Sequence, residues 1–218
     1  MSAFTLVIGN KNYSSWSLRP WLAMKMAGVA FEELVIPLRQ DATVAEIARH
    51  SPGGKVPSLR HGELVVWESI AILEYAAEAF PEARLWPRQR EARAVARAVS
   101  AEMHAGFAAL RTHMPMNIRG SIPGRDRTPE VEKDIRRIVA VWEDCRARFG
   151  EGGPFLFGGF GNADAMYAPV VTRFTTYGVA LEGAARAYAD AILALPPMRE
   201  WFAAANAEPW TIAETDAA

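Results

Sequence analysis

The sequence predicts two parts of different structural class, an α/β domain followed by an all-helical domain. Short runs of strand-forming residues alternate with helical periodicity over the first part, whereas nearly every segment from Gln89 onward has helical periodicity. Between them, the stretch "FPEARLWPR" contains two prolines and is the best candidate for a linker. We therefore expect an α/β domain at residues 1–80, a linker at 81–88 and a helical domain at 89–218.

The predicted order of elements in the first part is β-α-β-α-β-β-α. Residues 4–8 are an apolar run typical of a buried strand, and helical periodicity follows in "WSLRPWLAMKMAG". A second strand, "FEELVIPL", stops at Pro37, and the short helix "ATVAEIARH" leads into the loop "SPGGKVP". Two short strands flank His61-Gly62, and a helix begins at Ser69. The βαβ start implies a parallel pair and the tight turn an antiparallel pair, so we expect a mixed sheet.

Pro20 influences where the first helix is expected to begin. A proline has no backbone N–H, so it is harmless only in the first turn, where no intrahelical partner exists. This favours a helix that starts near Ser17, with Ser17 as the N-cap and Pro20 at the third position. Ser14 and Ser15 would then lie in the loop between the first strand and this helix.

The helical part begins with "REARAVARAVSAEMHAGFAALRTHM", which predicts one long amphipathic helix that stops at Pro115. The next helix has Thr128 as its cap and Pro129 at its first position, and it ends at Gly150. Three more helical segments are expected at about residues 163–177, 183–194 and 198–206.

The composition excludes several kinds of protein. Half of the 218 residues are hydrophobic and 22% are charged, which is unlike a disordered chain. The net charge is −1 and no basic stripe carries interleaved aromatic residues, so we expect no nucleic-acid partner. Apolar runs such as "FTLVIG" are too short to span a membrane, and the first residues lack the pattern of a signal peptide. Cys145 is the single cysteine, which leaves no internal disulfide and no Cys-x-x-Cys pair. We expect a cytoplasmic protein without a metal site.

Ser14 and Ser15 are the first candidates for chemistry, because they precede a helix at the end of a strand. The unpaired N–H groups and the positive end of the dipole at a helix N-terminus stabilise an anion such as a thiolate. A serine hydroxyl there can donate a hydrogen bond to that thiolate. A nucleophilic serine would need a neighbouring base, and the histidines at positions 50, 61, 104 and 113 show no spacing typical of a catalytic triad.

Two further motifs lie at similar joints of the predicted sheet. In "GGKVPSL", Pro57 favours an extended Val56 whose backbone edge can pair with an extended peptide. In "VVWESIAIL", Glu68 and Ser69 stand where a strand passes into a helix. There the serine and the helix N-terminus can receive a carboxylate, and the glutamate can meet an ammonium group.

These three motifs, together with "GFGNADAMYAPV" in the helical part, resemble those of the cytosolic glutathione S-transferases, and the resemblance covers essentially the entire chain. It implies a thioredoxin-like N-terminal domain that binds glutathione, a helical domain that forms the electrophile pocket, and a homodimer. "SSWS" is similar to the "SSCS" of the zeta class, which includes maleylacetoacetate isomerases, although tryptophan replaces the cysteine of that class.

The resemblance assigns roles residue by residue. Ser14 matches the serine that activates the glutathione sulfur, with Ser15 as its rival. The residues that match the family's glutathione-binding positions are Lys55 for the glycyl carboxylate, Val56 before the cis-proline Pro57 for the cysteinyl backbone, and Glu68 with Ser69 for the γ-glutamyl end.

In the helical domain, Asp164 matches the family's capping acid, and Gly161 holds the N-cap place, so Asp164 is interpreted as a folding residue. The candidates for the second-substrate pocket are Trp16, His104, Phe107, Arg111 and Met114, and core packing is the more probable role for Phe107 and Met114. Cys145 is expected to be a buried structural thiol.

The leading functional hypothesis is a glutathione transferase that joins glutathione to small hydrophobic electrophiles, with the thiolate stabilised by Ser14. The first alternative is a zeta-like, glutathione-dependent maleylacetoacetate isomerase. The second is a protein that keeps the fold and binds without turnover. Thiol–disulfide exchange is disfavoured, because serine rather than cysteine stands at position 14.

Overall fold

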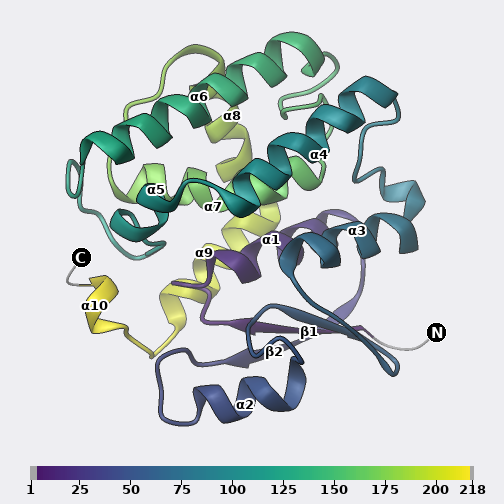
Figure 1. The fold of residues 1–218 in the computed structure, drawn as a ribbon, viewed down its shortest axis with the longest axis vertical. Coiled ribbons are helices and arrows are strands. Elements are labelled where there is room, and N and C mark those ends of the chain that lie inside the picture. The colour runs from purple at the N-terminus through teal and green to yellow at the C-terminus, as the bar shows by residue number, and fades with distance from the viewer. Residues whose placement is uncertain (1–3, 217–218) are drawn as a thin grey trace.

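A four-stranded mixed sheet organises the first part of the chain in the computed structural model, which describes residues 4–216 (Figure 1). The strand order is β2-β1-β3-β4, with β1 parallel to β2 and antiparallel to β3, and β3 antiparallel to β4. The predicted mixed sheet is therefore confirmed. The strands are β1 (Phe4–Gly9), β2 (Phe31–Ile36), β3 (Ser58–His61) and β4 (Leu64–Val66).

The tight turn between β3 and β4 lies one residue later than the sequence suggested. His61 pairs with Leu64 in the ladder, so Gly62 and Glu63 are the two turn residues. Gly62 has a φ of +61°, a conformation that glycine adopts without steric cost.

Helices cover both faces of the sheet (Figure 1). Alternate residues of β1 point to opposite faces, so Leu6 and Ile8 join the main core, whereas Val7 joins a small cluster with Ile36 and Ile47. Ile47 belongs to α2, which covers that second face. The helices of this part are α1 (Ser15–Met26), α2 (Thr43–His50) and α3 (Ser69–Ala79), followed by the 3₁₀ turn η1 (Pro81–Ala83).

α1 begins three residues earlier than predicted, with Ser14 instead of Ser17 at its N-cap, so Ser17 lies inside the helix and Pro20 is its sixth residue. The carbonyl of Ser14 accepts hydrogen bonds from Ser17 N at 3.1 Å and Leu18 N at 3.2 Å, which starts the helix with a tightened first turn. Pro20 removes only the bond that its N–H would have donated to the carbonyl of Trp16. Ser17 makes no capping bond; its Oγ accepts from the N–H of Gly9 instead.

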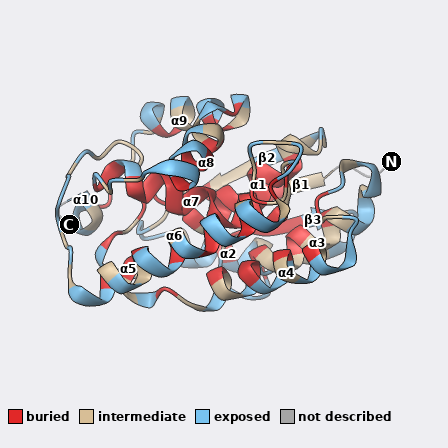
Figure 2. Ribbon diagram, turned by 90° about the horizontal axis from the view of Figure 1, so that it is seen from above, coloured by how far each residue is buried: buried red, intermediate tan, exposed pale blue. Residues whose placement is uncertain are grey.

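The second part is a bundle of helices around α7, which is buried along nearly its whole length (Figure 2). α1 packs against α7 and joins the bundle to the sheet. No helix within residues 4–216 is long and apolar enough to cross a membrane. The helices are α4 (Arg90–Ala105), α5 (Ala108–His113), α6 (Pro129–Phe149), α7 (Asn162–Thr176), α8 (Gly183–Ala194), α9 (Pro196–Ala207) and the short α10 (Ala213–Asp216).

The predicted long helix is wrong, because the chain breaks between α4 and α5. Gly106 is extended, with φ of −99° and ψ of −167°, and Phe107 is left-handed, with φ of +59°. Arg111 stabilises the break, since its Nη2 donates to the carbonyls of Met103 and His104 in the last turn of α4. The last carbonyls of α4 are therefore satisfied by a side chain, which the hydrophobic periodicity of the sequence does not indicate.

Asp164 caps α7 as expected. Gly161 is the N-cap residue and has no side chain, so the Asp164 carboxylate accepts from Gly161 N at 2.8 Å and from Leu156 N at 3.0 Å. The side chain is fully buried, and burial raises the pKa of Asp164 from its ordinary value of 3.8 to about 7.

This pKa predicts a pH dependence of stability. Between about pH 4 and pH 7 the native state holds a proton that the unfolded chain has released, so the free energy of unfolding falls as pH rises. Asp164→Asn does not titrate and loses one acceptor, so at pH 5 it is expected to be less stable than the wild type by about 1–3 kcal/mol. The stability gap should narrow as pH rises from about 5 to about 8, and urea unfolding of both proteins measures it.

Asp190→Asn is the matched control, because Asp190 is exposed and paired only with Arg186 one turn away on α8. It should change stability little and without this pH trend. A gap between the wild type and Asp164→Asn that stays constant from pH 5 to pH 8 would contradict the assignment.

Candidate active site

One cavity of about 500 Å³ lies where the sheet domain meets α4. Four segments line it: the first turn of α1, the loop before β3, the joint between β4 and α3, and the last turn of α4. Its walls are formed by Trp16, Lys55, Val56, Pro57, Trp67, Glu68 and His104.

The second and third motifs of the sequence analysis therefore line the same cavity. Lys55 and Glu68 are exposed on its wall, and the peptide bond between Val56 and Pro57 is cis. Val56 makes no hydrogen bond with the described residues, so both its N–H and its C=O remain open to a ligand.

Ser69 is the first residue of α3 and lies just behind Glu68, with only 1% of its surface exposed. Within residues 4–216 its buried Oγ has no hydrogen-bond partner. A buried hydroxyl without a partner costs free energy, which makes it a ready donor for a carboxylate at the N-terminus of α3.

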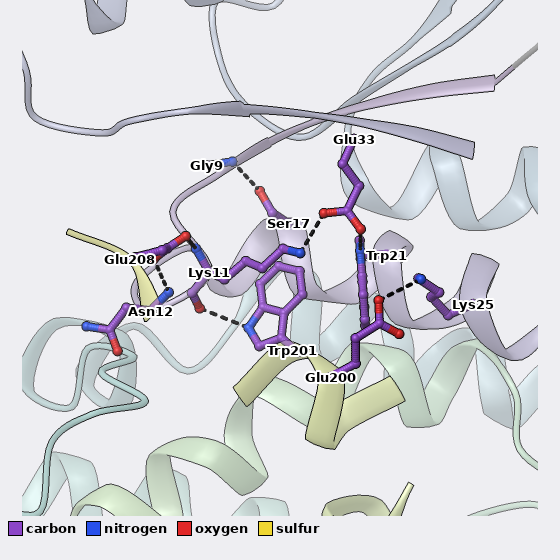
Figure 3. Close-up of polar contacts among 10 residues, drawn as sticks. All are labelled: Gly9, Lys11, Asn12, Ser17, Trp21, Lys25, Glu33, Glu200, Trp201 and Glu208. Atoms are coloured by element: carbon purple, nitrogen blue, oxygen red, sulfur yellow. Dashed lines mark hydrogen bonds and ion pairs between the residues drawn. The ribbon is translucent and has the colours of Figure 1, made fainter. Parts of the chain in front are cut away.

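Ser14 and Ser15 immediately precede Trp16 of the cavity wall but are not themselves lining residues, and both are nearly buried, with 6% and 7% exposed surface. Ser14 Oγ is 2.7 Å from Ser17 Oγ, and either hydroxyl can be the donor. Ser17 Oγ also accepts from Gly9 N at 3.0 Å (Figure 3). When Ser17 is the donor to Ser14, the Ser14 proton is free to be donated elsewhere.

Ser15 is held by a long-range contact with α7. Arg173 is 4% exposed and donates from Nη2 to Ser15 Oγ at 3.0 Å and from Nε to the carbonyl of Met114 at 2.8 Å. Burial, with the nearby Arg111 as a second cause, lowers the pKa of Arg173 to about 10. Ser15 thus accepts a hydrogen bond from a cation, and its own hydroxyl proton is left to be donated.

The loop before the two serines is fastened by the C-terminal segment. Glu208 accepts from Lys11 N at 2.6 Å and from Asn12 N at 3.0 Å, and Trp201 Nε1 donates to the carbonyl of Lys11 at 2.9 Å (Figure 3). Further along, Tyr13 donates to the carboxylate of Asp216. The position of the serines therefore depends on residues about two hundred positions away.

The residues predicted to form a second-substrate pocket lie in two different places in the structure. Trp16 and His104 line the cavity, and Arg111 packs on the Trp16 ring at 4.5 Å. Phe107 and Met114 belong to the hydrophobic core, which was the more probable role. Cys145 is buried as expected, and burial raises the pKa of its thiol to about 12, which keeps it unreactive.

Sequence reasoning missed Arg19, Arg173 and Glu208. Arg19 and Arg173 lie among apolar residues of α1 and α7 that are otherwise buried, so a charged residue within a buried stretch was the available signal. For Glu208 the sequence carried no signal, because its partners are backbone amides far along the chain. No group of three or more His, Cys, Asp or Glu side chains that could hold a metal ion occurs in the part of the chain that the structure describes.

Comparisons with known sequences show the family to which the two parts of the chain belong. The family model for the glutathione S-transferase N-terminal domain matches residues 13–79, and the model for the glutathione S-transferase C-terminal domain matches residues 125–204. Glutathione S-transferase GstB of Escherichia coli is 29% identical over 181 residues, which cover 75% of this chain and 84% of the relative. The maleylacetoacetate isomerase of Rattus norvegicus is 29% identical over 124 residues, 56% of this chain and 55% of the relative.

Solved structures show the same fold. A glutathione transferase from Methylococcus capsulatus has a TM-score of 0.72 at 22% identity and covers 94% of this chain and 99% of its own. A glutathione transferase homologue from Burkholderia, solved with bound glutathione, has a TM-score of 0.70 at 21% identity and covers 95% of this chain and 100% of its own.

The contacts of Glu208 predict that it fixes the loop of residues 10–13. Glu208→Ala leaves two backbone amides without their acceptor, which should lower the free energy of unfolding by about 1–3 kcal/mol. Hydrogen exchange at the amides of Lys11 and Asn12 should accelerate more than exchange in the core of α7. Denaturant unfolding and amide exchange measure the two effects.

Glu200→Ala is the control, because Glu200 lies on neighbouring α9 and makes only a partly exposed ion pair with Lys25 (Figure 3). It should cost well under about 1 kcal/mol. Equal exchange at Lys11 and Asn12 in the wild type and Glu208→Ala would show that Glu208 does not hold the loop.

Proposed function

The chain belongs to the glutathione S-transferase family and is an enzyme of that family, and from this premise we propose that it joins glutathione to small electrophiles in the cavity between the sheet and α4. The carrying observation is the convergence of Lys55, Val56 and Glu68 on one cavity whose opposite wall contains His104 of the helical domain. A peptide-binding wall thus faces a wall built by the second domain.

The chemistry of glutathione fits the residues of the first wall. Its γ-glutamyl end carries an ammonium group for Glu68 and a carboxylate for the Ser69 hydroxyl at the N-terminus of α3. Its extended cysteinyl residue matches the open backbone N–H and C=O of Val56. Its glycyl carboxylate suits Lys55, which is exposed on the same wall. This placement would direct the thiol toward the N-terminus of α1.

Activation of the thiol needs a modest preference for the thiolate. A thiol with pKa of about 8.5 is mostly protonated at neutral pH, and lowering that pKa by about two units corresponds to about 2.7 kcal/mol. One hydroxyl donor to a charged acceptor supplies about 1.5–3 kcal/mol, and a helix N-terminus adds about 0.3–1 kcal/mol. A single serine with the first turn of α1 is therefore sufficient. The thiolate then attacks the electrophilic carbon held near Trp16 and His104.

Ser14 is the proposed donor to the thiolate. In the arrangement in which Gly9 N–H donates to Ser17 and Ser17 donates to Ser14, one of the two that the 2.7 Å contact allows, the Ser14 proton is free for the thiolate, which supports this assignment. Ser15 remains the rival, since it also has a free proton and its oxygen is polarised by Arg173. We further propose that the enzyme acts as a homodimer, as the family resemblance implies.

An alternative function is the isomerisation of a maleylacetoacetate-like substrate with glutathione. The "SSWS" sequence and the similarity to the maleylacetoacetate isomerase of Rattus norvegicus favour it. It would use the same glutathione wall and differ in the second substrate. Parallel assays with chlorodinitrobenzene and with maleylacetone separate the two activities. If calorimetry shows no glutathione binding, both enzymatic hypotheses fail. Binding without turnover in either assay would favour the third hypothesis, a protein that binds without turnover.

Ser14→Ala is expected to lower turnover about tenfold to hundredfold with little change in glutathione affinity, because a hydrogen bond made to the developing charge is lost. The pKa of the bound thiol, followed by thiolate absorbance against pH, should rise. Steady-state kinetics and calorimetry measure turnover and affinity separately.

Ser17→Ala and Ser15→Ala complete the series. Ser17→Ala removes the partner that orients Ser14, so it should also raise the thiol pKa, by less than Ser14→Ala does. A wild-type rate in Ser14→Ala, with a collapse in Ser15→Ala, would move the assignment to Ser15.

Glu68→Ala is expected to weaken glutathione binding mainly, by about tenfold to hundredfold, because one charge-assisted bond to the substrate ammonium is lost. Glu63→Ala, which changes an exposed glutamate in the turn between β3 and β4, is the matched control. Calorimetry measures both, and an unchanged affinity in Glu68→Ala refutes its role.

A further inference from the structure

Three basic side chains gather around Trp16 on the cavity wall. The guanidinium carbon of Arg19 lies 4.2 Å from the centre of the Trp16 ring, and that of Arg111 lies 4.5 Å from it. The ring of His104 meets Trp16 edge-on, with centroids 5.2 Å apart. Trp16 and His104 line the cavity, and both guanidinium groups contact the Trp16 ring although neither arginine is itself a lining residue.

Negative charge compensates the two arginines of this cluster only in part: burial lowers the pKa of Arg111 by more than the Asp134 carboxylate raises it. Arg19 is 1% exposed, and burial, followed by the neighbouring Arg111 and Arg173, lowers its pKa well below the ordinary value. Among the described residues, neither Arg19 nor Arg111 forms an ion pair with a carboxylate. Buried positive charge without a counter-ion is costly in a protein interior.

Each member of the cluster also has a buried nitrogen without a hydrogen-bond partner within residues 4–216. These atoms are Arg19 Nη1, Arg111 Nε and His104 Nδ1. The remaining contacts show that the side chains are held in place: Arg19 Nε donates to the carbonyl of Met166, and Arg111 Nη2 donates to carbonyls of α4. Two fixed guanidinium groups with unpaired N–H donors can bind an acceptor that carries negative charge, such as a carboxylate.

Arg173 provides an internal comparison. It is nearly as buried as Arg19, and it donates to Ser15, Met114 and Pro169, so that no buried nitrogen of Arg173 is left unpaired among the described residues. Structural contacts therefore use the buried donors of Arg173 in full, whereas Arg19 and Arg111, which also make structural contacts, each keep one buried donor spare.

We propose that the cluster of Arg19, Arg111 and His104 around Trp16 binds the carboxylate of the second substrate, so that the enzyme prefers electrophiles that carry an acid group. The inference rests on the proposed transferase function and names the substrate class of that site. A planar carboxylate matches the fork of a guanidinium group and accepts two parallel hydrogen bonds. Lys55 and Glu68 stay with glutathione on the other wall, so the two ligands do not compete.

A matched pair of electrophiles tests the preference. The probes are 4-chloro-3-nitrobenzoate and its methyl ester, which share the ring and the leaving group and differ in charge. The glutathione thiolate forms a C–S bond at the carbon that carries chlorine, chloride leaves, and the thiol proton passes to solvent. The ratio of kcat/KM to the uncatalysed rate constant, taken for each probe, removes their different intrinsic reactivity. The wild type should favour the acid over the ester by at least tenfold.

Arg111→Met should reduce this acid-to-ester preference by about tenfold, and Arg111→Lys should restore part of it, because lysine keeps the charge without the fork. Arg148→Met is the control: Arg148 is an exposed arginine paired with Asp144 and Glu91, and its loss should leave the preference unchanged. An equal preference for acid and ester in the wild type, or an equal loss for both probes in Arg111→Met, overturns the proposal.

A binding measurement separates this proposal from the transferase function itself. Calorimetry with 3-nitrobenzoate and with methyl 3-nitrobenzoate, neither of which can react, reports on the cluster without turnover. The acid should bind at least tenfold more tightly to the wild type and lose that advantage in Arg111→Met. If glutathione fails to bind or react, the proposed function is wrong. If glutathione reacts but the acid binds no better than its ester, the acid-binding cluster alone is wrong.

Discussion

Helix α1 lies between the sheet and α7, and nine of its twelve residues are buried, which leaves it almost no solvent-facing side. An ordinary amphipathic helix buries one face, so its polar residues can point into water. α1 cannot do this, and Ser15, Ser17 and Arg19 must find partners inside the protein. Ser17 accepts a hydrogen bond from the end of β1, and Ser15 accepts one from Arg173 of α7. Arg19 donates to a carbonyl of α7 and packs on the ring of Trp16. The active-site geometry follows from these internal contacts.

The same constraint extends to the loop that precedes α1. Asn12 lies in this loop, is fully buried, and bonds to Asn117 and to Arg119 N, which belong to the segment after α5. Arg119 in turn donates to the carbonyls of Glu208 and Trp210, so three distant segments close around one short loop. Such a network is stable only when every member is satisfied. The serines are consequently placed by the folded chain as a whole and not by their local sequence.

The sequence could predict the features that depend on neighbouring residues. The apolar run of β1, the cap formed by Thr128 and Pro129, and the role of Asp164 all follow from local patterns, and the structure contains each of them. It could also indicate that Val56 and Glu68 come together, because joints between strands and helices gather at one edge of a sheet, and both residues line one cavity. The break at Gly106 and the start of α1 were missed, since each is settled by a competing interaction. Arg111, one helix further along the chain, satisfies the end of α4, and a shared carbonyl tightens the first turn of α1.

Positive charge near the N-terminus of α1 would attract both the glutathione thiolate and the carboxylate of the proposed second substrate. The placement of the arginines there therefore decides which of the two each one binds. A thiolate and a carboxylate repel each other, so a single cation between them would have to divide its donors. This chain separates the tasks: Arg173 is committed to Ser15 and to backbone carbonyls, whereas Arg19 and Arg111 retain spare donors beside Trp16. The indole ring contacts both of these guanidinium groups, which favours their close approach despite their like charges. Because Arg19 is nearly inaccessible to water, salt screens its field weakly, and its attraction for an acidic substrate would persist at physiological ionic strength. Under the proposed acid-binding role, Trp16, where the zeta class has cysteine, would contribute to specificity, because its ring contacts both cations.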